Sequence, residues 1–220
     1  MLSASVASRG PGHRRAAMNS GDVFAGHYRL AVKTAVFRDA SGQIVPAEQV
    51  ADIPTLLASV PPDNTMRANY PGLLVSATAS PEEKLAATPS RVAEEQRNVT
   101  IPAWIWYVKK ETDNDFHVII GSSADPASVT YMNVEVSGLP VTADDPNLTD
   151  LQNARAQLIA VTGNEPGVLR YEAFSPPLPV SITGSLLYDG DHVPGEVGPV
   201  GHQPQTTWEI HPVITIQQRQ

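Results

Sequence analysis

The order of strand-like and helix-like segments after residue 98 constrains the fold of this chain more than any other feature of its sequence. Five segments have the β-branched, aromatic or alternating apolar residues of strands: residues 99–109, 116–120, 131–137, 180–188 and 207–217. One helix-like segment separates the third from the fourth. The order β-β-β-α-β-β is typical of the OB-fold, a five-stranded Greek-key barrel. The sequence therefore predicts a mainly β, OB-like barrel with one helix between strands three and four.

The helix of this barrel is predicted by its two ends and by its apolar stripe. Thr149 and Gln152 have the spacing of a capping box, which begins a helix. An apolar stripe at helical spacing runs from Leu151 to Val161, and Gly163 is placed to end the helix.

The first half of the chain is predicted to be irregular because many of the 20 prolines of the chain interrupt it. Residues 28–37 alternate as one strand, residues 73–77 read as a short strand, and single helical turns are expected at residues 48–51 and 55–59. The apolar residues here are too scattered for an independent core.

Three segments are therefore expected along the chain. Residues 1–18 carry three arginines and no acidic residue, and we predict a disordered basic tail. Residues 19–97 are predicted to form an N-terminal extension packed on the barrel, which covers residues 98–220.

The charge of the chain argues against nucleic-acid binding. The net charge is −8, and residues 101–220 hold 14 acidic and 5 basic side chains, which gives −9 for the barrel. A nucleic-acid site needs lysine and arginine to neutralise phosphates. Trp104, Trp106 and Tyr107 are candidates for stacking on bases, but aromatic residues in strands are more often core.

Composition excludes further classes of protein. The chain has no cysteine, which excludes disulfides and thiolate sites. It has no apolar run of about 18 residues, so we expect no membrane-spanning helix. The N-terminus lacks the apolar region of a secretory signal, and we expect a cytoplasmic protein.

Polar residues alternate on three of the predicted strands and define a candidate site. The pairs are Asp115 and His117, Asn133 and Glu135, and Glu209 and His211. Residues two apart point to the same face of a strand, and these three strands are neighbours in an OB barrel. Imidazoles and carboxylates suit Zn²⁺, Mn²⁺ or Fe²⁺.

The metal hypothesis assigns the ion to Asp115, His117, Glu209 and His211. Asp189, Asp191 and His192 offer further ligands from the following loop. The second and fifth strands are separated by the third, so their backbones are expected to lie about 9–10 Å apart. One ion is shared only if the strands converge or the loop supplies a ligand.

Two other interpretations of the same residues remain open. In the first interpretation, His117 and His211 are core histidines, and their hydrogen bonds to Asp115 and Glu209 close the barrel. In the second interpretation, the three polar pairs form a solvated outer face.

Two segments resemble a group of largely uncharacterised bacterial proteins. That group has a K-x-E-x-D-x-D-F-H hairpin and a terminal W-E-I-H-P strand on an OB-like barrel. The hairpin residues present in order are Lys110, Glu111, Asp113, Asp115, Phe116 and His117, and the strand spans residues 208–212. The resemblance covers about residues 97–217 and includes an Ala-Arg pair at 154–155. Members of the group often have a cysteine near the helix, which this chain lacks. It implies a fold and no reaction.

The chain contains no G-x-S-x-G elbow, Walker loop, G-x-G-x-x-G or H-E-x-x-H motif. The sequence therefore favours a non-catalytic binding or interaction module whose partner is a protein, a saccharide or a small molecule. The alternative is a divalent-metal-dependent hydrolase that uses the Asp/His/Glu residues. Single-stranded nucleic-acid binding is the lesser alternative. The Gly- and Pro-rich segment 189–205 is a candidate partner-binding loop.

Overall fold

The computed structural model describes residues 20–76, 78–86 and 90–220, so the predicted basic tail lies outside the described residues. The strands are β1 (Glu48–Gln49), β2 (Asn98–Lys110), β3 (Phe116–Gly121), β4 (Tyr131–Val136), β5 (Glu172–Tyr188) and β6 (Trp208–Gln218). The helices are α1 (Leu30–Lys33), α2 (Ile53–Ala58), α3 (Asp63–Asn69), α4 (Pro81–Ala86) and α5 (Leu148–Thr162), with 3-10 turns η1 (Ser20–Asp22), η2 (Pro71–Leu73) and η3 (Ala93–Glu95). Within the described ranges, none of the helices is long and apolar enough to cross a membrane.

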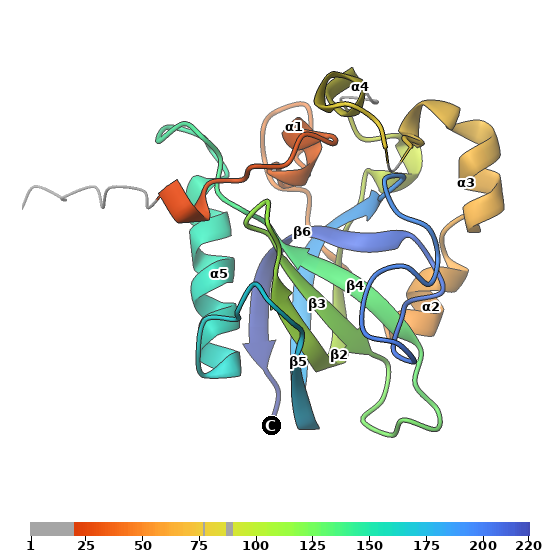
Figure 1. The fold of residues 1–220 in the computed structure, drawn as a ribbon, viewed down its shortest axis with the longest axis vertical. Helices are drawn as coiled ribbons and strands as arrows, with labels where there is room; N and C mark the ends of the chain where they lie inside the picture. Colours follow the sequence, from red (N-terminus) through yellow and green to blue (C-terminus); the bar gives the residue numbers. More distant parts are fainter. Residues whose placement is uncertain (1–19, 77, 87–89) are drawn as a thin grey trace, which may run out of the picture.

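The six strands form one sheet that closes into a ring (Figure 1). Its order is β1-β2-β3-β4-β6-β5, and β5 pairs in turn with β2. Closure is possible because β2 and β5 are long, with 13 and 17 residues, and β2 pairs with both β3 and β5. The β1–β2 and β4–β6 pairs are parallel, and the other pairs are antiparallel. The prediction of a mainly β fold is confirmed.

The predicted number of strands and the place of the helix are wrong. The short strand β1 adds a sixth member, so α5 lies between β4 and β5 instead of between the third and fourth strands. β1 also replaces the helical turn predicted at residues 48–51. The reason is tertiary, because the backbone of Val50 donates a hydrogen bond of 2.9 Å to the carbonyl of Thr100 in β2. The turn predicted at residues 55–59 is present as part of α2.

The strand predicted at residues 28–37 is also wrong, because this segment contains α1. Alternation predicts a strand only when its polar positions face water, and here two of them are buried. Arg29 forms a buried ion pair with Glu95, and Lys33 forms one with Asp189. The strand predicted at residues 73–77 is absent over 73–76, and residue 77 lies outside the described residues.

Helix α5 ends as predicted but begins differently. Gly163 adopts a left-handed φ of 84°, and its backbone N–H donates to the carbonyl of Ile159 at 2.8 Å. Asn147 is the N-cap residue, and Thr149 lies inside the helix, so the predicted capping box does not form. The helix lies beside β6 and buries Leu151 and Leu158 (Figure 1).

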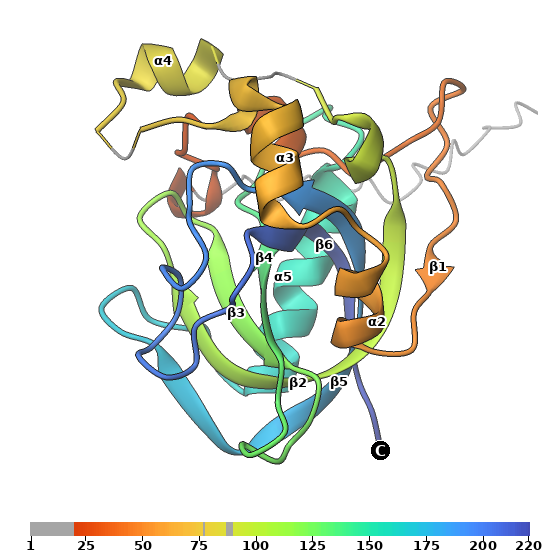
Figure 2. The same ribbon diagram turned by 90° about the vertical axis from the view of Figure 1, so that its right-hand side faces the viewer.

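Segments before residue 98 share one hydrophobic core with the ring. Ile53, Leu56, Met66 and Leu73 are fully buried and belong to the same apolar cluster as the inner residues of β2 to β6. Figure 2 shows α2 and α3 beside the ring, with α4 at one end of it. The N-terminal segments therefore pack on the ring through one shared apolar core.

Candidate functional site

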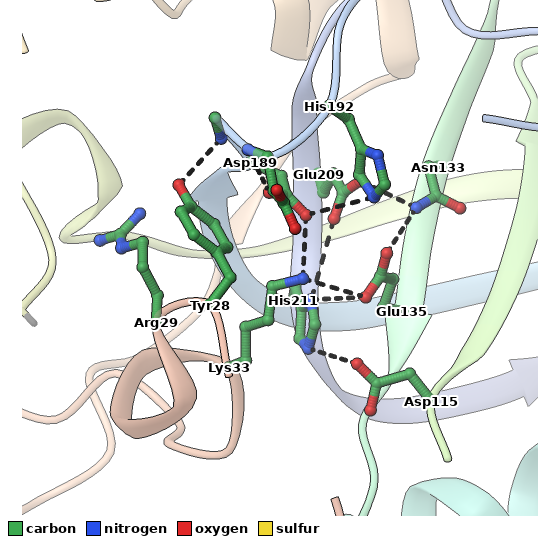
Figure 3. Close-up of polar contacts among 12 residues, drawn as sticks. Tyr28, Arg29, Lys33, Asp115, Asn133, Glu135, Asp189, His192, Glu209 and His211 are labelled. Atoms are coloured by element: carbon green, nitrogen blue, oxygen red, sulfur yellow. Dashed lines mark hydrogen bonds and ion pairs between the residues drawn. The ribbon is translucent and has the colours of Figure 1, made fainter. Parts of the chain in front are cut away.

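Buried polar side chains from five segments meet at one place in the ring (Figure 3). This polar cluster consists of Lys33 from α1, Asp115 and His117 at the start of β3, Asn133 and Glu135 from β4, Asp189 and His192 after β5, and Glu209 and His211 from β6. Eight of them are buried, and the His192 side chain is 26% exposed. All six residues of the predicted polar set are members. Their burial contradicts the interpretation as a solvated outer face.

The register of three neighbouring strands places Glu135 at the centre of the cluster. His117 of β3 pairs with Glu135 of β4, and β4 pairs with β6 so that His211 lies on the other side of Glu135. The Oε1 atom of Glu135 lies 2.9 Å from Nε2 of His117. Its Oε2 atom lies 2.9 Å from Nδ1 of His211. Glu135 therefore spans the gap between the second and fifth predicted strands.

Neighbouring side chains hold the carboxylates of the cluster in position. The side-chain amide of Asn133 donates to Oε1 of Glu135 and to Oε1 of Glu209, both at 2.9 Å. Asp115 accepts a short hydrogen bond from the backbone N–H of Gly138 through Oδ1. Its Oδ2 atom lies 3.4 Å from Nε2 of His211.

Lys33 is the member of the cluster that sequence reasoning missed. Its Nζ atom donates to Oδ2 of Asp189 at 2.9 Å and lies 3.8 Å from Oε2 of Glu135. The one signal in the sequence is a lysine inside a largely apolar segment with no acidic neighbour. That signal does not identify the partner, which is 156 residues away.

The segment after β5 carries Asp189 and His192 and is held by Tyr28. The hydroxyl of Tyr28 donates to the carbonyl of Leu73 at 2.8 Å and accepts from the backbone N–H of Gly190 at 3.0 Å. The backbone N–H of Asp189 donates to the carbonyl of Thr207 at 3.0 Å. Part of the loop predicted to bind a partner thus contributes to the polar cluster.

Replacing Gly190 with alanine is expected to destabilise the fold, because the added Cβ atom would overlap the backbone carbonyl of Leu73. Overpacking of this kind costs about 1–3 kcal/mol. Gly167→Ala is the control, since a Cβ atom there would meet nothing closer than 3.7 Å. Urea unfolding measures both free energies. Equal stabilities would show that the two backbones do not approach as described.

Burial and charge divide the carboxylates of the cluster into two kinds. Burial raises the pKa of Asp115 and of Glu209 well above their usual values, and the neighbouring carboxylates add to each shift. Burial would also raise the pKa of Glu135, but His117 and Lys33 hold it well below its usual range. Glu135 is therefore the carboxylate of this set that its neighbours hold most strongly in the ionised form.

The basic groups of the cluster respond to the same two causes. Burial would lower the pKa of Lys33, but the surrounding carboxylates, with Asp189 first, raise it well above its usual value. Burial would lower the pKa of His117 too, and Glu135 raises it above the ordinary value. For His211 burial prevails, and its pKa is lowered. His211 is therefore a neutral imidazole, the form that binds metal ions.

A cavity of about 330 Å³ adjoins one side of the cluster. His117, His192 and Lys33 line it together with Tyr28 and Asp113. This volume is at the lower end of the range for small-molecule sites, which is about 300–1,000 Å³. The cluster therefore has one side open to a small ligand and one side enclosed by the ring.

Three groups of side chains in the cluster have the spacing of metal ligands. They are His117 with Glu135 and His192, Asp115 with Glu135 and His211, and Glu135 with Asp189 and Glu209, and the ligand atoms of each group lie within 4.8 Å of one another. Glu135 belongs to all three. The sequence assigned one ion to Asp115, His117, Glu209 and His211. The structure divides these four residues among the three groups, and the residue common to all three groups was not one of the four.

The predicted stacking residues lie outside the polar cluster and contact other groups of the chain. The guanidinium of Arg219 lies 4.6 Å from the ring centroid of Trp104. The Nε1 atom of Trp106 donates to the carbonyl of Ser123 at 3.1 Å, and the Tyr107 hydroxyl lies 3.2 Å from His202 Nε2. None of the three is among the described residues that line the cavity.

No protein-family model, curated protein or solved structure matches this chain. Functional inference therefore rests on the geometry and chemistry of the cluster.

Proposed function

We propose that this chain is a divalent-metal-dependent hydrolase that binds an ion through His117, Glu135 and His192. The observation that carries the proposal is that these two imidazoles and one carboxylate have clustered donor atoms beside a cavity. Catalytic zinc sites use three protein ligands of this kind and leave the fourth position for water. Mn²⁺ and Fe²⁺ accept the same ligands.

Carboxylates behind the two histidines support metal binding. Nδ1 of His117 lies 3.4 Å from Oε1 of Glu111, and Nδ1 of His192 lies 3.6 Å from Oε2 of Glu196. Metal-bound histidines commonly donate their second N–H to a carboxylate, which orients the ring and raises its basicity. Each imidazole thus has a carboxylate near its Nδ1 atom. The Nε2 atom of His117 faces Glu135, and the Nε2 atom of His192 faces Asp189.

The arrangement supplies the groups that hydrolysis requires. A zinc ion held there would lower the pKa of a bound water to about 7 and so supply the nucleophile. Asp189, whose Oδ2 atom lies 3.8 Å from Nε2 of His192, is the carboxylate that would accept the proton of that water. Lys33 lines the cavity and is placed to stabilise negative charge on a substrate. The volume of the cavity favours a small polar substrate.

We also infer that the ring is an OB-like barrel. Apart from β1, its elements follow the expected order β-β-β-α-β-β. The two motifs of the resembled bacterial group supply Asp115 and His117 from one end and Glu209 and His211 from the other, which supports that relationship. The second candidate function is a non-catalytic small-molecule binding module, which the same cavity would serve without an ion.

Metal binding separates the two candidates. Zn²⁺ or Mn²⁺ added to chelator-treated protein is expected to stabilise it by about 2.7 kcal/mol at a free concentration of 100 times the Kd. For a chain of this length each kcal/mol raises Tm by about 2–4 °C. His192→Ala should reduce the shift, whereas His27→Ala, an exposed histidine of the same cavity, should leave it unchanged.

Activity is tested on p-nitrophenyl acetate and p-nitrophenyl phosphate. We expect hydrolysis of at least one that is lost with chelator, restored by the ion and lost again in His192→Ala. Absence of any thermal shift would rule out the hydrolase. A thermal shift without metal-dependent hydrolysis of either ester would favour a metal-binding module without catalysis.

A further inference from the structure

The enclosed side of the polar cluster has the features of a second metal site. Asp115, Glu135 and His211 have donor atoms within 4.8 Å of one another, and all three side chains are buried. They do not line the cavity on which the first group opens. The third group adds Glu209, whose Oε2 atom lies 3.8 Å from Nδ1 of His211.

Polar atoms on this side lack hydrogen bonds among the residues that the structure describes. They are both ring nitrogens of His211, Oδ2 of Asp115, Oε2 of Glu135 and Oε2 of Glu209. The distances from His211 to Glu135 and Asp115 are short, at 2.9 and 3.4 Å, but the groups lack hydrogen-bond alignment. Buried polar groups nearly always have a hydrogen-bond partner, and leaving one without a partner is unfavourable. Donor atoms that converge without hydrogen bonds indicate a ligand among them.

The two oxygens of Glu135 point to opposite sides. Oε1 lies beside His117 in the first group, and Oε2 lies beside His211 in the second, each at 2.9 Å. A carboxylate so placed can give one oxygen to each of two ions. Paired ions in hydrolytic enzymes lie about 3.5–4 Å apart, the separation that a bridging carboxylate permits.

The charge of the cluster is consistent with two ions. Four buried carboxylates, those of Asp115, Glu135, Asp189 and Glu209, surround the single ammonium of Lys33. One divalent ion with Lys33 supplies three positive charges against four negative ones. Two divalent ions with Lys33 supply five positive charges. A hydroxide shared by the two ions would add a fifth negative charge and make the cluster neutral.

We infer that the cluster holds a dinuclear centre, in which the second divalent ion binds Asp115, Glu135 and His211 and Glu135 bridges the two ions. This inference rests on the proposed function, since it adds an ion to the same site. The second ion would hold the shared hydroxide from the enclosed side while the substrate enters from the cavity.

The number of bound ions tests the inference on the whole chain. Chelator-treated protein is loaded with Mn²⁺, freed of excess by gel filtration and measured by elemental analysis. We expect two ions in the unaltered chain, one in His192→Ala and one in Asp115→Asn, with the fold checked by circular dichroism. A single ion in the unaltered chain would overturn the second site and leave the proposed hydrolase standing. No bound ion would overturn both.

Electron paramagnetic resonance of the Mn²⁺-loaded unaltered chain tests the bridge without any substitution. Two ions that share Glu135 are expected to give an exchange-coupled spectrum. His192→Ala, with one ion, should give the six-line spectrum of isolated Mn²⁺. Two ions with only that isolated spectrum would contradict the bridging role of Glu135.

Discussion

Replacing Glu135 with glutamine is expected to abolish the stabilisation of the protein by divalent cations. Ions at a free concentration about 1,000 times their Kd stabilise a fold by about 4.1 kcal/mol per site. Glutamine has nearly the same shape as glutamate but only one oxygen and no charge, so it cannot join the His117 and His211 sides of the cluster. Glu135 belongs to each of the three ligand groups, so this single change should affect all of them.

The measurement is the difference in unfolding free energy with and without Mn²⁺ for each protein. This difference cancels the effect of the substitution on the metal-free fold, in which Glu135 lies close to His117, Lys33 and His211. Glu82→Gln is the matched control, because Glu82 is exposed on α4. A full metal response in Glu135→Gln would remove Glu135 from the site and contradict both the hydrolase and the dinuclear centre.

Replacing Glu95 with glutamine is expected to lower the free energy of unfolding by about 3–5 kcal/mol, the typical cost of leaving a buried charge without its partner. Both oxygens of Glu95 accept from the guanidinium of Arg29, at 2.6 and 2.7 Å, and both side chains are fully buried. The carboxylate also accepts from the backbone N–H groups of Tyr188 and Val92. Glutamine would turn an N–H₂ group toward one of these donors.

A second arginine–glutamate pair provides the control for this experiment. Arg97 also donates twice to the carboxylate of Glu48, at 2.7 and 3.2 Å, but these side chains are 26% and 54% exposed. Exposed pairs contribute about 0–1 kcal/mol, so Glu48→Gln should change stability little. Urea unfolding followed by tryptophan fluorescence measures both. Equal losses would show that burial does not set the strength of the Arg29–Glu95 pair.

The strands after residue 98 could be predicted because each carries its own signal. The segment 99–109 is rich in β-branched and aromatic residues, and β2 covers it from Asn98 to Lys110. β5 begins at Glu172, eight residues before its predicted start, because prolines at 176, 177 and 179 argue against a strand there. Residues 172, 173, 178 and 179 pair with β2, which the local sequence does not reveal.

Most members of the polar cluster could be predicted from the sequence, but Lys33 and the grouping of the residues could not. Alternation on three strands indicates Asp115, His117 and the four others, since side chains two apart share a face. The central position of Glu135 follows from strand register, and register depends on pairings between residues far apart in sequence. The role of His192 depends on the hydrogen bonds by which Tyr28 holds the loop after β5.

The sequence by itself determined the mainly β fold, the single long helix and the three polar pairs, because periodicity and composition act over a few residues. Only the tertiary structure decided that residues 30–33 form a helix, that Lys33 enters the cluster and that the polar pairs are buried. Burial of charge is favourable only when opposite charges meet, and here Lys33 meets Asp189 at 156 residues' separation. The pairing of buried opposite charges exists only in the folded chain, so the composition of the site and its chemistry are set by the tertiary structure.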